Sequence, residues 1–492
     1  MPYKTARPME VRRMADVNPF YLGTFVVYLI IVLALGVWGY TKTSDVMDFW
    51  VFGQEMGPWL ATWSFVANFV SAVSVIGFIG AVYGEGYTLM THTIFGLMLG
   101  ISALYFVVDR IRNLDVLTFP DLIANVTGYQ IARPIAGTVL LGNAWIYLIM
   151  QLVGASLLVT TITGAPYRYM VWVIGTVFIV YTVLGGMVSV AWTDLLQGTL
   201  MVGAVLLSLG YMMFDLGGFT AINQQFASID SSYVHPTAEG AYTLIGIAAI
   251  IVAFFGTIFT EQNYIVRIAA TRDVRAAKLH LAASGVILAV FYTALVVLGG
   301  ATTVALETTG LSVETQDNAF PTLITDYVPS SVGVIIILAV MSAILSTTDT
   351  RLHSTGITTA RDLYSYFRPE SSDDTQLKVS RMATVFFGIT ATAAAVNPPG
   401  SIIELYNFRA VLLTSAFLIP VYGGLYWVGL SSRAILASVV TGAILGVGAE
   451  FAGGLYGVPS AFVGLGSALL VLFIGHVLLS DSEPKGGTIA SD

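Results

Sequence analysis

The chain contains no cysteine among its 492 residues, which excludes disulfide bonds and metal sites built from thiolates. Charge is scarce as well, because Asp, Glu, Lys and Arg make up 10% of the residues, against about 25% in soluble domains. No cluster of Lys and Arg is present, so we expect no nucleic-acid partner. With 56% hydrophobic residues and a mean hydropathy of +0.82, the composition is that of a polytopic membrane protein whose surroundings are the lipid bilayer.

Apolar runs long enough to cross about 30 Å of hydrocarbon recur along nearly the whole chain. No cleavage signature follows the first run, so we expect a retained span and not a signal peptide. The predicted fold class is an all-α polytopic membrane protein with thirteen transmembrane helices. Their predicted ranges are 20–38, 57–84, 86–108, 134–167, 169–193, 195–214, 240–260, 281–306, 327–348, 382–403, 405–432, 434 to about 454, and about 460 to 480.

The distribution of Lys and Arg predicts the orientation, because short cytoplasmic loops are enriched in them. An outside N-terminus places fifteen of these residues on the inner side: Lys42, Arg110, Arg112, Arg133, Arg267, Arg272, Arg275, Lys278, Arg351, Arg361, Arg368, Lys378, Arg381, Arg433 and Lys485. The outer side then holds Lys4, Arg7, Arg12, Arg13 and Arg168, of which the first four favour the opposite orientation for the first span. We predict a cell-membrane protein with its N-terminus outside and its C-terminus in the cytoplasm.

A polar stripe lies in residues 338–361, LAVMSAILSTTDTRLHSTGITTAR. Ala343, Ser346, Thr347 and Thr350 fall at i, i+3, i+4 and i+7, so they share one helix face. Hydroxyl and carbonyl oxygens suit a small hard cation, and a polar face within a span must look toward protein or water. Alternatively, the hydroxyls bond the preceding helical turn and help helices to pack, and the stretch taken by itself favours this second interpretation.

The second predicted span combines polar and small residues, with Asn68, Ser71 and Ser74 among glycines and alanines. Such a sequence tolerates an unwound turn at the membrane midplane, where free carbonyls can bind a cation. A kinked but continuous helix held by polar side chains is the alternative. Gly96/Gly100 and Gly442/Gly446 have the small-xxx-small spacing that allows close helix packing.

Acidic residues near two other span ends allow two interpretations each. Asp194 in LGGMVSVAWTDLLQG is predicted either to cap a helix N-terminus or to draw cations along the inner exit path. Glu261 and Gln262 in TEQNYIVRIAA lie either at the inner surface, which their chemistry favours, or at a central cavity.

Several of these motifs together resemble the signatures of the sodium:solute symporter family: Gly57-Pro58-Trp59 before a small, polar span, LGGMVSVAWTDLLQG, TEQNYIVRIAA and SAILSTTDTRLHSTGITTARDLY. The resemblance covers about residues 53–426, and its last stretch is closer to the pantothenate and proline branch than to the sugar branch. It implies a leucine-transporter-like core of two inverted five-helix repeats, 57–214 and 240–430. One extra helix, 20–38, would precede the core and two, within 433–480, would follow it.

The resemblance also implies a sodium ion between the first and eighth core helices. Carried over by position, its ligands are the backbone carbonyls of Ala67, Val70 and Ala343 and the side-chain oxygens of Ser346 and Thr347. Our candidates for substrate binding are Asn68, Ser71, Glu261, Gln262 and Arg409, and those for the cation pathway are Asp194 and Asp349. This chain departs from the family pattern at three positions: Phe69, where the proline branch has an acid, Glu261, where an Asp or Asn is usual, and Arg409, where the family pattern has no basic residue.

Arg409 interrupts an otherwise apolar span, which costs about 2.5 to 3.5 kcal/mol on insertion scales, so it should face a cavity or a partner. Its guanidinium could hold a carboxylate of a small organic anion through two hydrogen bonds. Equally, it could pair internally with Glu404, Glu261 or Asp349, or extend to the outer surface. Asp349 is a candidate either for a second cation position or for a partner of Arg351 or Arg409.

The predicted function is secondary active transport, in which sodium influx drives uptake of a small organic solute by alternating access. Sodium is the expected coupling ion and no other cofactor is expected. Proton coupling, or a solute sensor on the same fold, is the alternative. A membrane enzyme would need converging acids, histidines or a nucleophile, and a channel would need a filter repeat; neither pattern is visible in the sequence. The sequence predicts no oligomeric state.

Overall fold

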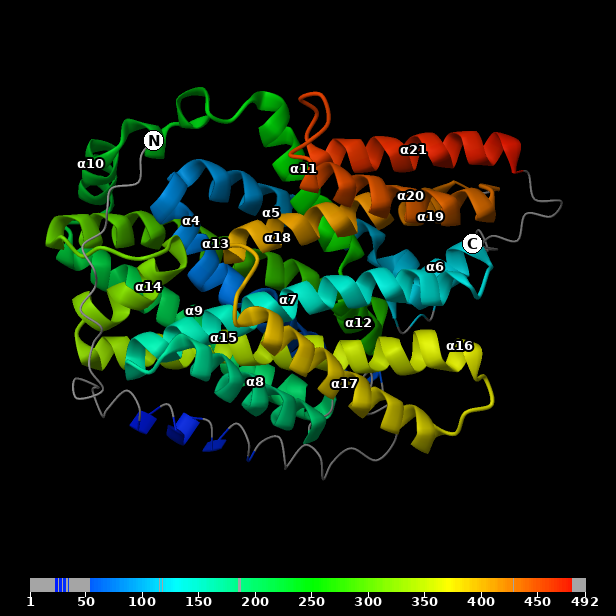
Figure 1. The fold of residues 1–492 in the computed structure, drawn as a ribbon, viewed down its shortest axis with the longest axis horizontal. Helices are drawn as coiled ribbons and strands as arrows, with labels where there is room; N and C mark the ends of the chain where they lie inside the picture. Colours follow the sequence, from blue (N-terminus) through cyan, green and yellow to red (C-terminus); the bar gives the residue numbers. More distant parts are fainter. Residues whose placement is uncertain are drawn as a thin grey trace.

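The structure is a computed structural model that describes residues 54–479, except 115, 117, 185, 186 and 428, together with eight residues between 23 and 34. Every named element of the described residues is a helix. The long helices lie side by side along one direction, with α20 (Ser432–Phe451) and α21 (Ser460–Leu478) at one edge of the bundle (Figure 1). Toward the opposite edge lie α8 (Tyr167–Leu184) and α17 (Asp373–Ala395).

Eight helices or helix runs of the described residues are long and apolar enough to span a membrane, or ten spans if each of two bent pairs is one span. The eight include α20 and α21, and the others are α5 (Tyr87–Asn113), α7 (Ala132–Thr163), α9 (Met187–Asp215), α13 (Val274–Thr309), α15 (Ser330–Ile357) with its extension, and α18 (Ile402–Leu413) continued to α19 (Ile419–Tyr426). The prediction of thirteen spans is thus supported in part. α8 and α17 correspond to two further predicted spans but fall short of the same criterion, and the predicted span 20–38 lies largely outside the described residues.

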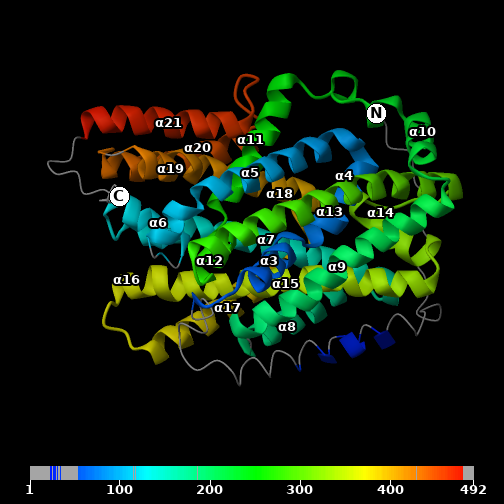
Figure 2. The same ribbon diagram turned by 180° about the vertical axis from the view of Figure 1, so that it is seen from behind.

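The breaks of the two bent pairs are buried, at Val70 and at Glu261. α3 (Pro58–Phe69) is followed after a break by η3 (Val73–Gly77) and α4 (Phe78–Glu85), with a bend of 53°. α11 (Leu244–Thr260) and α12 (Gln262–Ala270) meet at 41°. Seen from behind, α3 lies between α12 and α9 (Figure 2).

The break after α3 confirms the unwound alternative for this span. Val70 has extended backbone angles (φ −83°, ψ 133°), and side chains satisfy backbone amides freed beyond it. The amide of Ala72 donates to Oε1 of Gln151 in α7 at 3.0 Å, and that of Val73 donates to Oγ of Ser71 at 3.2 Å. The same Oγ accepts from the hydroxyl of Tyr147, also in α7, at 2.9 Å, so α7 holds the break open.

Four segments are π-helical: η3, η7 (Leu323–Tyr327), η8 (Thr358–Tyr364) after α15, and η9 (Thr414–Leu418) between α18 and α19. Such one-turn bulges inside helices are frequent at functional sites. Shorter helices fill the connections: α6 (Phe119–Thr127), α10 (Phe219–Ile229), η4 (Ser231–Val234), η5 (Ala238–Gly240), η6 (Gln316–Asn318), α14 (Ala319–Thr322) and α16 (Ser365–Phe367).

Glycines bring helices into contact as their spacing predicts. A Cβ on Gly442 would lie 2.1 Å from the carbonyl oxygen of Ser415 in η9, and one on Gly96 would lie 2.5 Å from that of Ile251 in α11. Close backbone approach of this kind increases van der Waals contact between helices that lipid cannot drive together.

Basic residues lie at the end of α5 and at the start of α7. Arg110 and Arg112 at the end of α5 donate to the carbonyls of Leu425 and Thr271, and Arg133 at the start of α7 pairs with Asp362 in η8 at 3.3 Å. Two residues counted for the inner surface, Arg267 and Arg351, are instead buried in the core, so they carry no information on orientation.

Candidate functional site

The polar stripe of α15 faces the break after α3. The hydroxyl of Ser346 lies 3.0 Å from the carbonyl oxygen of Ala67 and 3.1 Å from that of Ala343. The hydroxyl of Thr347 lies 2.9 Å from the carbonyl oxygen of Val70 and 2.9 Å from that of Ala343. All five residues are buried. The structure therefore brings together the five oxygens expected to hold sodium, and the hydroxyls also make the bonds to the preceding turn that the packing interpretation requires.

Oxygen atoms from carbonyls and hydroxyls are the donors that hard monovalent and divalent cations prefer. The arrangement joins an unwound segment of α3 to an intact helix, α15, through contacts that cross from one helix to the other. A cation bound here would thus hold the two helices together.

Asp194 lies inside α9 and is fully buried, so the prediction that it caps a helix N-terminus is wrong. Its Oδ2 lies 3.1 Å from Nη2 of Arg267 in α12 and accepts from the hydroxyl of Ser64 in α3 at 2.8 Å. Arg267 donates further to the carbonyl of Ser64 at 3.1 Å and to Oγ1 of Thr350 in α15 at 3.3 Å. The pair therefore connects α3, α9, α12 and α15, and it reaches α15 at Thr350, the last residue of the stripe.

Glu261 occupies the break between α11 and α12, where its φ and ψ of −82° and 113° interrupt the helix. Its carboxylate forms an ion pair with Arg351 of α15 through Oε1 and with Arg409 of α18 through Oε2. The surface location favoured by its chemistry is thus wrong, as it is for Gln262, since their exposed fractions are 1% and 4%. Of the internal partners considered for Arg409, Glu261 is the one that binds it. Glu404 instead completes a capping box with Ser401 at the start of α18.

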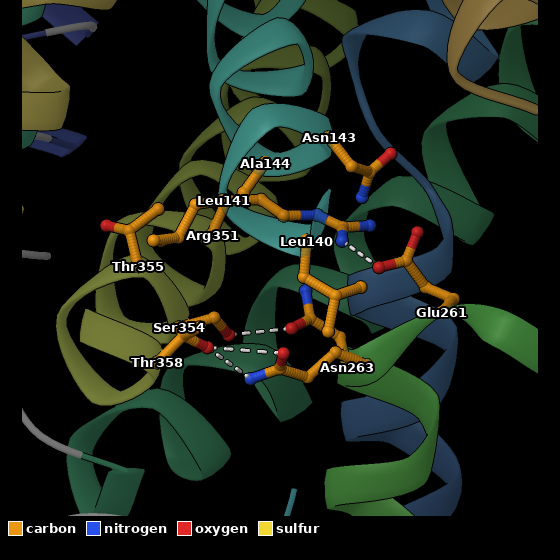
Figure 3. A pocket seen from close by; sticks show the side chains of 11 residues that line it. Leu140, Leu141, Asn143, Ala144, Glu261, Asn263, Arg351, Ser354, Thr355 and Thr358 are labelled. Carbon is orange, nitrogen blue, oxygen red and sulfur yellow. Dashed lines mark hydrogen bonds and ion pairs between the residues drawn. The ribbon is translucent and has the colours of Figure 1, made fainter. Parts of the chain in front are cut away.

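Figure 3 shows the carboxylate of Glu261 directed at the guanidinium of Arg351, in a pocket that Asn143, Asn263 and Thr358 also line. Nε of Arg409 donates to Oδ1 of Asn143 at 2.9 Å. The ring of Tyr147 lies against both guanidinium groups, with its centroid 4.1 Å from Cζ of Arg351 and 4.7 Å from that of Arg409. Cation–π contact stabilises such stacked pairs.

The other predicted residues lie near these two centres. Asn68 is fully buried one residue after Ala67, and neither atom of its amide has a partner among the described residues. Ser71 contacts Tyr147, and Gln262 donates to Oγ1 of Thr358 at 3.0 Å. Asp349 is buried on α15.

Sequence reasoning missed Arg351 and Arg267 as site residues. Both follow apolar runs in basic stretches, a pattern that indicates a cytoplasmic loop. The available signal was helical spacing, because Arg351 falls four residues after Thr347 and so shares a side of the helix with the stripe.

The family model described as "Sodium:solute symporter family" matches residues 49–442 of the chain. The chain belongs to the sodium:solute symporter family. It is therefore a sodium-coupled solute symporter, a multi-pass membrane protein and not an enzyme.

Relatives of this family member include the high-affinity proline transporter PutP of Bacillus subtilis (strain 168), which is 26% identical over 465 residues, covering 92% of this chain and 97% of the relative. The sodium/proline symporter of Staphylococcus aureus (strain bovine RF122 / ET3-1) is 26% identical over 442 residues, covering 85% of this chain and 83% of the relative.

Solved structures share the fold. The substrate-bound outward-open state of a Na+-coupled sialic acid symporter matches with a TM-score of 0.81 at 19% identity, covering 95% of this chain and 99% of that one. Mhp1, a nucleobase-cation-symport-1 family transporter in a closed conformation, matches with a TM-score of 0.53 at 13% identity, covering 90% and 98%. The fold is thus leucine-transporter-like.

Proposed function

We propose that this symporter couples the inward movement of sodium to the uptake of a small organic solute by alternating access. The sodium ion binds between α3 and α15, held by the carbonyl oxygens of Ala67, Val70 and Ala343 and the hydroxyls of Ser346 and Thr347. The convergence of these five oxygens at the break in α3 is the observation that carries the proposal. Sodium would favour the conformation in which the two helices are together, by its difference in affinity for the two states.

The core of the transport machinery would be the two inverted repeats, 57–214 and 240–430, with 20–38 before and 433–480 after them. We place the N-terminus outside and the C-terminus in the cytoplasm, on the basis of the basic residues at the end of α5 and at the starts of α7 and α13. The solute would bind near Asn68, Ser71, Glu261, Gln262 and Arg409. The buried, unpartnered amide of Asn68 supports this location. Asp194 and Asp349 are our candidates for the path by which the cation leaves.

The test is sodium-dependent uptake into proteoliposomes by Ser346→Ala and Thr347→Ala, with a panel of solutes that includes both proline and monocarboxylates, and with the solute that the wild type takes up. A hydrogen bond or ligand contact to a charged group contributes about 1.5 to 3 kcal/mol, so losing one of five ligands should raise the half-saturating sodium concentration about tenfold or more. Thr348→Val is the matched control, because that hydroxyl bonds Ile344 of its own helix at 2.6 Å.

Unchanged sodium dependence in both alanine variants would show that the ion binds elsewhere. Uptake driven by a proton gradient and indifferent to sodium would favour the proton-coupled alternative. A protein that binds solute without transporting it would favour a sensor.

A further inference from the structure

The cluster of Glu261, Arg351 and Arg409 holds more positive than negative charge. Two guanidinium groups, which stay protonated in proteins, share one carboxylate, which leaves a net charge of +1. Glu261 is the one acid of the described residues that contacts either guanidinium. The exposed fractions of the three residues are 2% or less. An uncompensated charge in the protein interior is costly, so this cluster favours an additional anion.

The guanidinium groups also retain unused donors. Arg409 uses Nε for Asn143 and Nη2 for Glu261, and Arg351 uses Nη1 for Glu261. The other terminal nitrogen of each group, Nη1 of Arg409 and Nη2 of Arg351, makes none of these three bonds. The ring of Tyr147 lies against both groups and fixes their planes. Guanidinium donors held in this way match the two oxygens of a carboxylate.

The cluster is placed where a solute could be coupled to sodium. Tyr147 donates to Ser71 at the break in α3, and Arg351 lies one helical turn after Thr347 on α15. The three charged residues belong to the α11–α12 break, α15 and α18, which are separate elements. A ligand bound to both arginines would therefore affect the same helices that the proposed sodium site joins.

We propose that Arg351 and Arg409 bind the carboxylate of a monoanionic substrate, and that Glu261 sets the charge of the site so that one negative charge neutralises it. The inference rests on the proposed transport function and names its substrate class. Both oxygens of Glu261 already bind guanidinium groups, and the net charge of +1 repels a substrate ammonium. A zwitterionic amino acid would leave the charge at +1, and an amide would leave it unchanged as well. The site therefore selects a carboxylate without a neighbouring amine.

The experiment uses the purified full chain and a panel of monocarboxylates from acetate to benzoate. Each is compared with its amide and, where one exists, with its α-amino acid, for example propionate with propionamide and alanine. Binding is measured by thermal stabilisation in sodium. We expect a carboxylate of the panel to stabilise the protein, and its amide and amino acid to bind at least about tenfold more weakly.

Variants separate charge from folding. Arg351→Gln makes the cluster neutral and should weaken carboxylate binding about tenfold or more, as should Arg409→Gln. The double variant Glu261→Gln/Arg351→Gln has a single guanidinium but restores the charge to +1, so it should bind the carboxylate more tightly than Arg351→Gln. Arg110→Gln is the matched control, because Arg110 also stacks on a tyrosine, Tyr426 at 4.0 Å, away from the cluster, and it should leave binding unchanged.

The proposal is overturned if no carboxylate stabilises the wild type, if amides or amino acids bind equally well, or if the double variant binds no better than Arg351→Gln. Uptake under a sodium gradient separates this result from the proposed function. Sodium-driven uptake of a neutral or zwitterionic solute alone would refute the substrate class and leave the coupling intact. Carboxylate binding together with transport that does not depend on sodium would support the substrate class and refute the sodium coupling.

Discussion

Removing either partner of the buried ion pair between Asp194 and Arg267 should destabilise the fold strongly. Both side chains have an exposed fraction of 0%, and their atoms lie 3.1 Å apart. Without Arg267, the carboxylate of Asp194 would keep one partner, the hydroxyl of Ser64, which donates to Oδ2. Its Oδ1 has no partner among the described residues. Removing one partner of such a pair costs about 3 to 5 kcal/mol, because the other charge is left buried.

We therefore expect Asp194→Asn and Arg267→Met each to lower the free energy of unfolding by about 3 to 5 kcal/mol. The double variant, which buries no charge, should cost less than either single one, so the coupling energy should amount to several kcal/mol. Equilibrium unfolding in mixed detergent micelles with increasing SDS, followed by tryptophan fluorescence, measures all four proteins.

The control cycle uses Lys278 and Asp109, whose atoms lie 2.5 Å apart but whose side chains are 35% and 42% exposed. Solvent screens such a pair, so its coupling should stay at or below about 1 kcal/mol. If the Asp194 and Arg267 single variants have additive costs, or if the buried and exposed cycles give equal coupling, the reasoning from burial is refuted.

Two further predictions concern the loop before α14 and a helix contact. Burial raises the pKa of Asp317 to about 6, with Glu404 nearby adding to the shift, and its Oδ2 accepts from the amide of Ile402 at 3.0 Å. Because the pKa of Asp317 is higher in the packed loop than in water, protonation of its carboxyl group favours the packed loop. Lowering the pH from 8 to 5 should therefore slow thiol labelling of the variant Ala81→Cys in α4 about tenfold. The substitution Asp317→Asn should remove this pH dependence. Gly442→Ala, whose Cβ would lie 2.1 Å from the Ser415 carbonyl oxygen, should destabilise by about 1 to 3 kcal/mol in the same SDS titration. A Cβ at Gly448, on the same helix, would meet open space, so Gly448→Ala should leave the stability unchanged. Equal destabilisation by the two substitutions would show that the contact between Gly442 and Ser415 is not tightly packed.

Sequence patterns predicted the features that depend on local chemistry. Apolar runs located the spanning helices, and helical spacing placed Ser346 and Thr347 on one face with Ala343. The small and polar composition around Ser71 indicated a break. Each of these follows from a short stretch of chain, without knowledge of what packs against it.

Partners distant in the sequence were out of reach of the same reasoning. Asp194 and Arg267 are 73 residues apart, and Glu261 and Arg409 are 148 apart, so no local pattern pairs them. A basic residue after an apolar run indicates a cytoplasmic loop, which is why Arg267 and Arg351 were counted for the inner surface. Burial became evident only when the helices were arranged in space.

The π-helical segments affect which changes of length the chain tolerates. A π turn such as η9 contains one residue more than an α-helical turn needs. Deleting one residue within η9 would therefore restore α-helical spacing and leave α19 facing the same neighbours. The same deletion within α18 would rotate every following side chain of the span by about 100° around the helix axis. These bulges thus mark the positions where a spanning helix can gain or lose one residue and still present the same face to its neighbours.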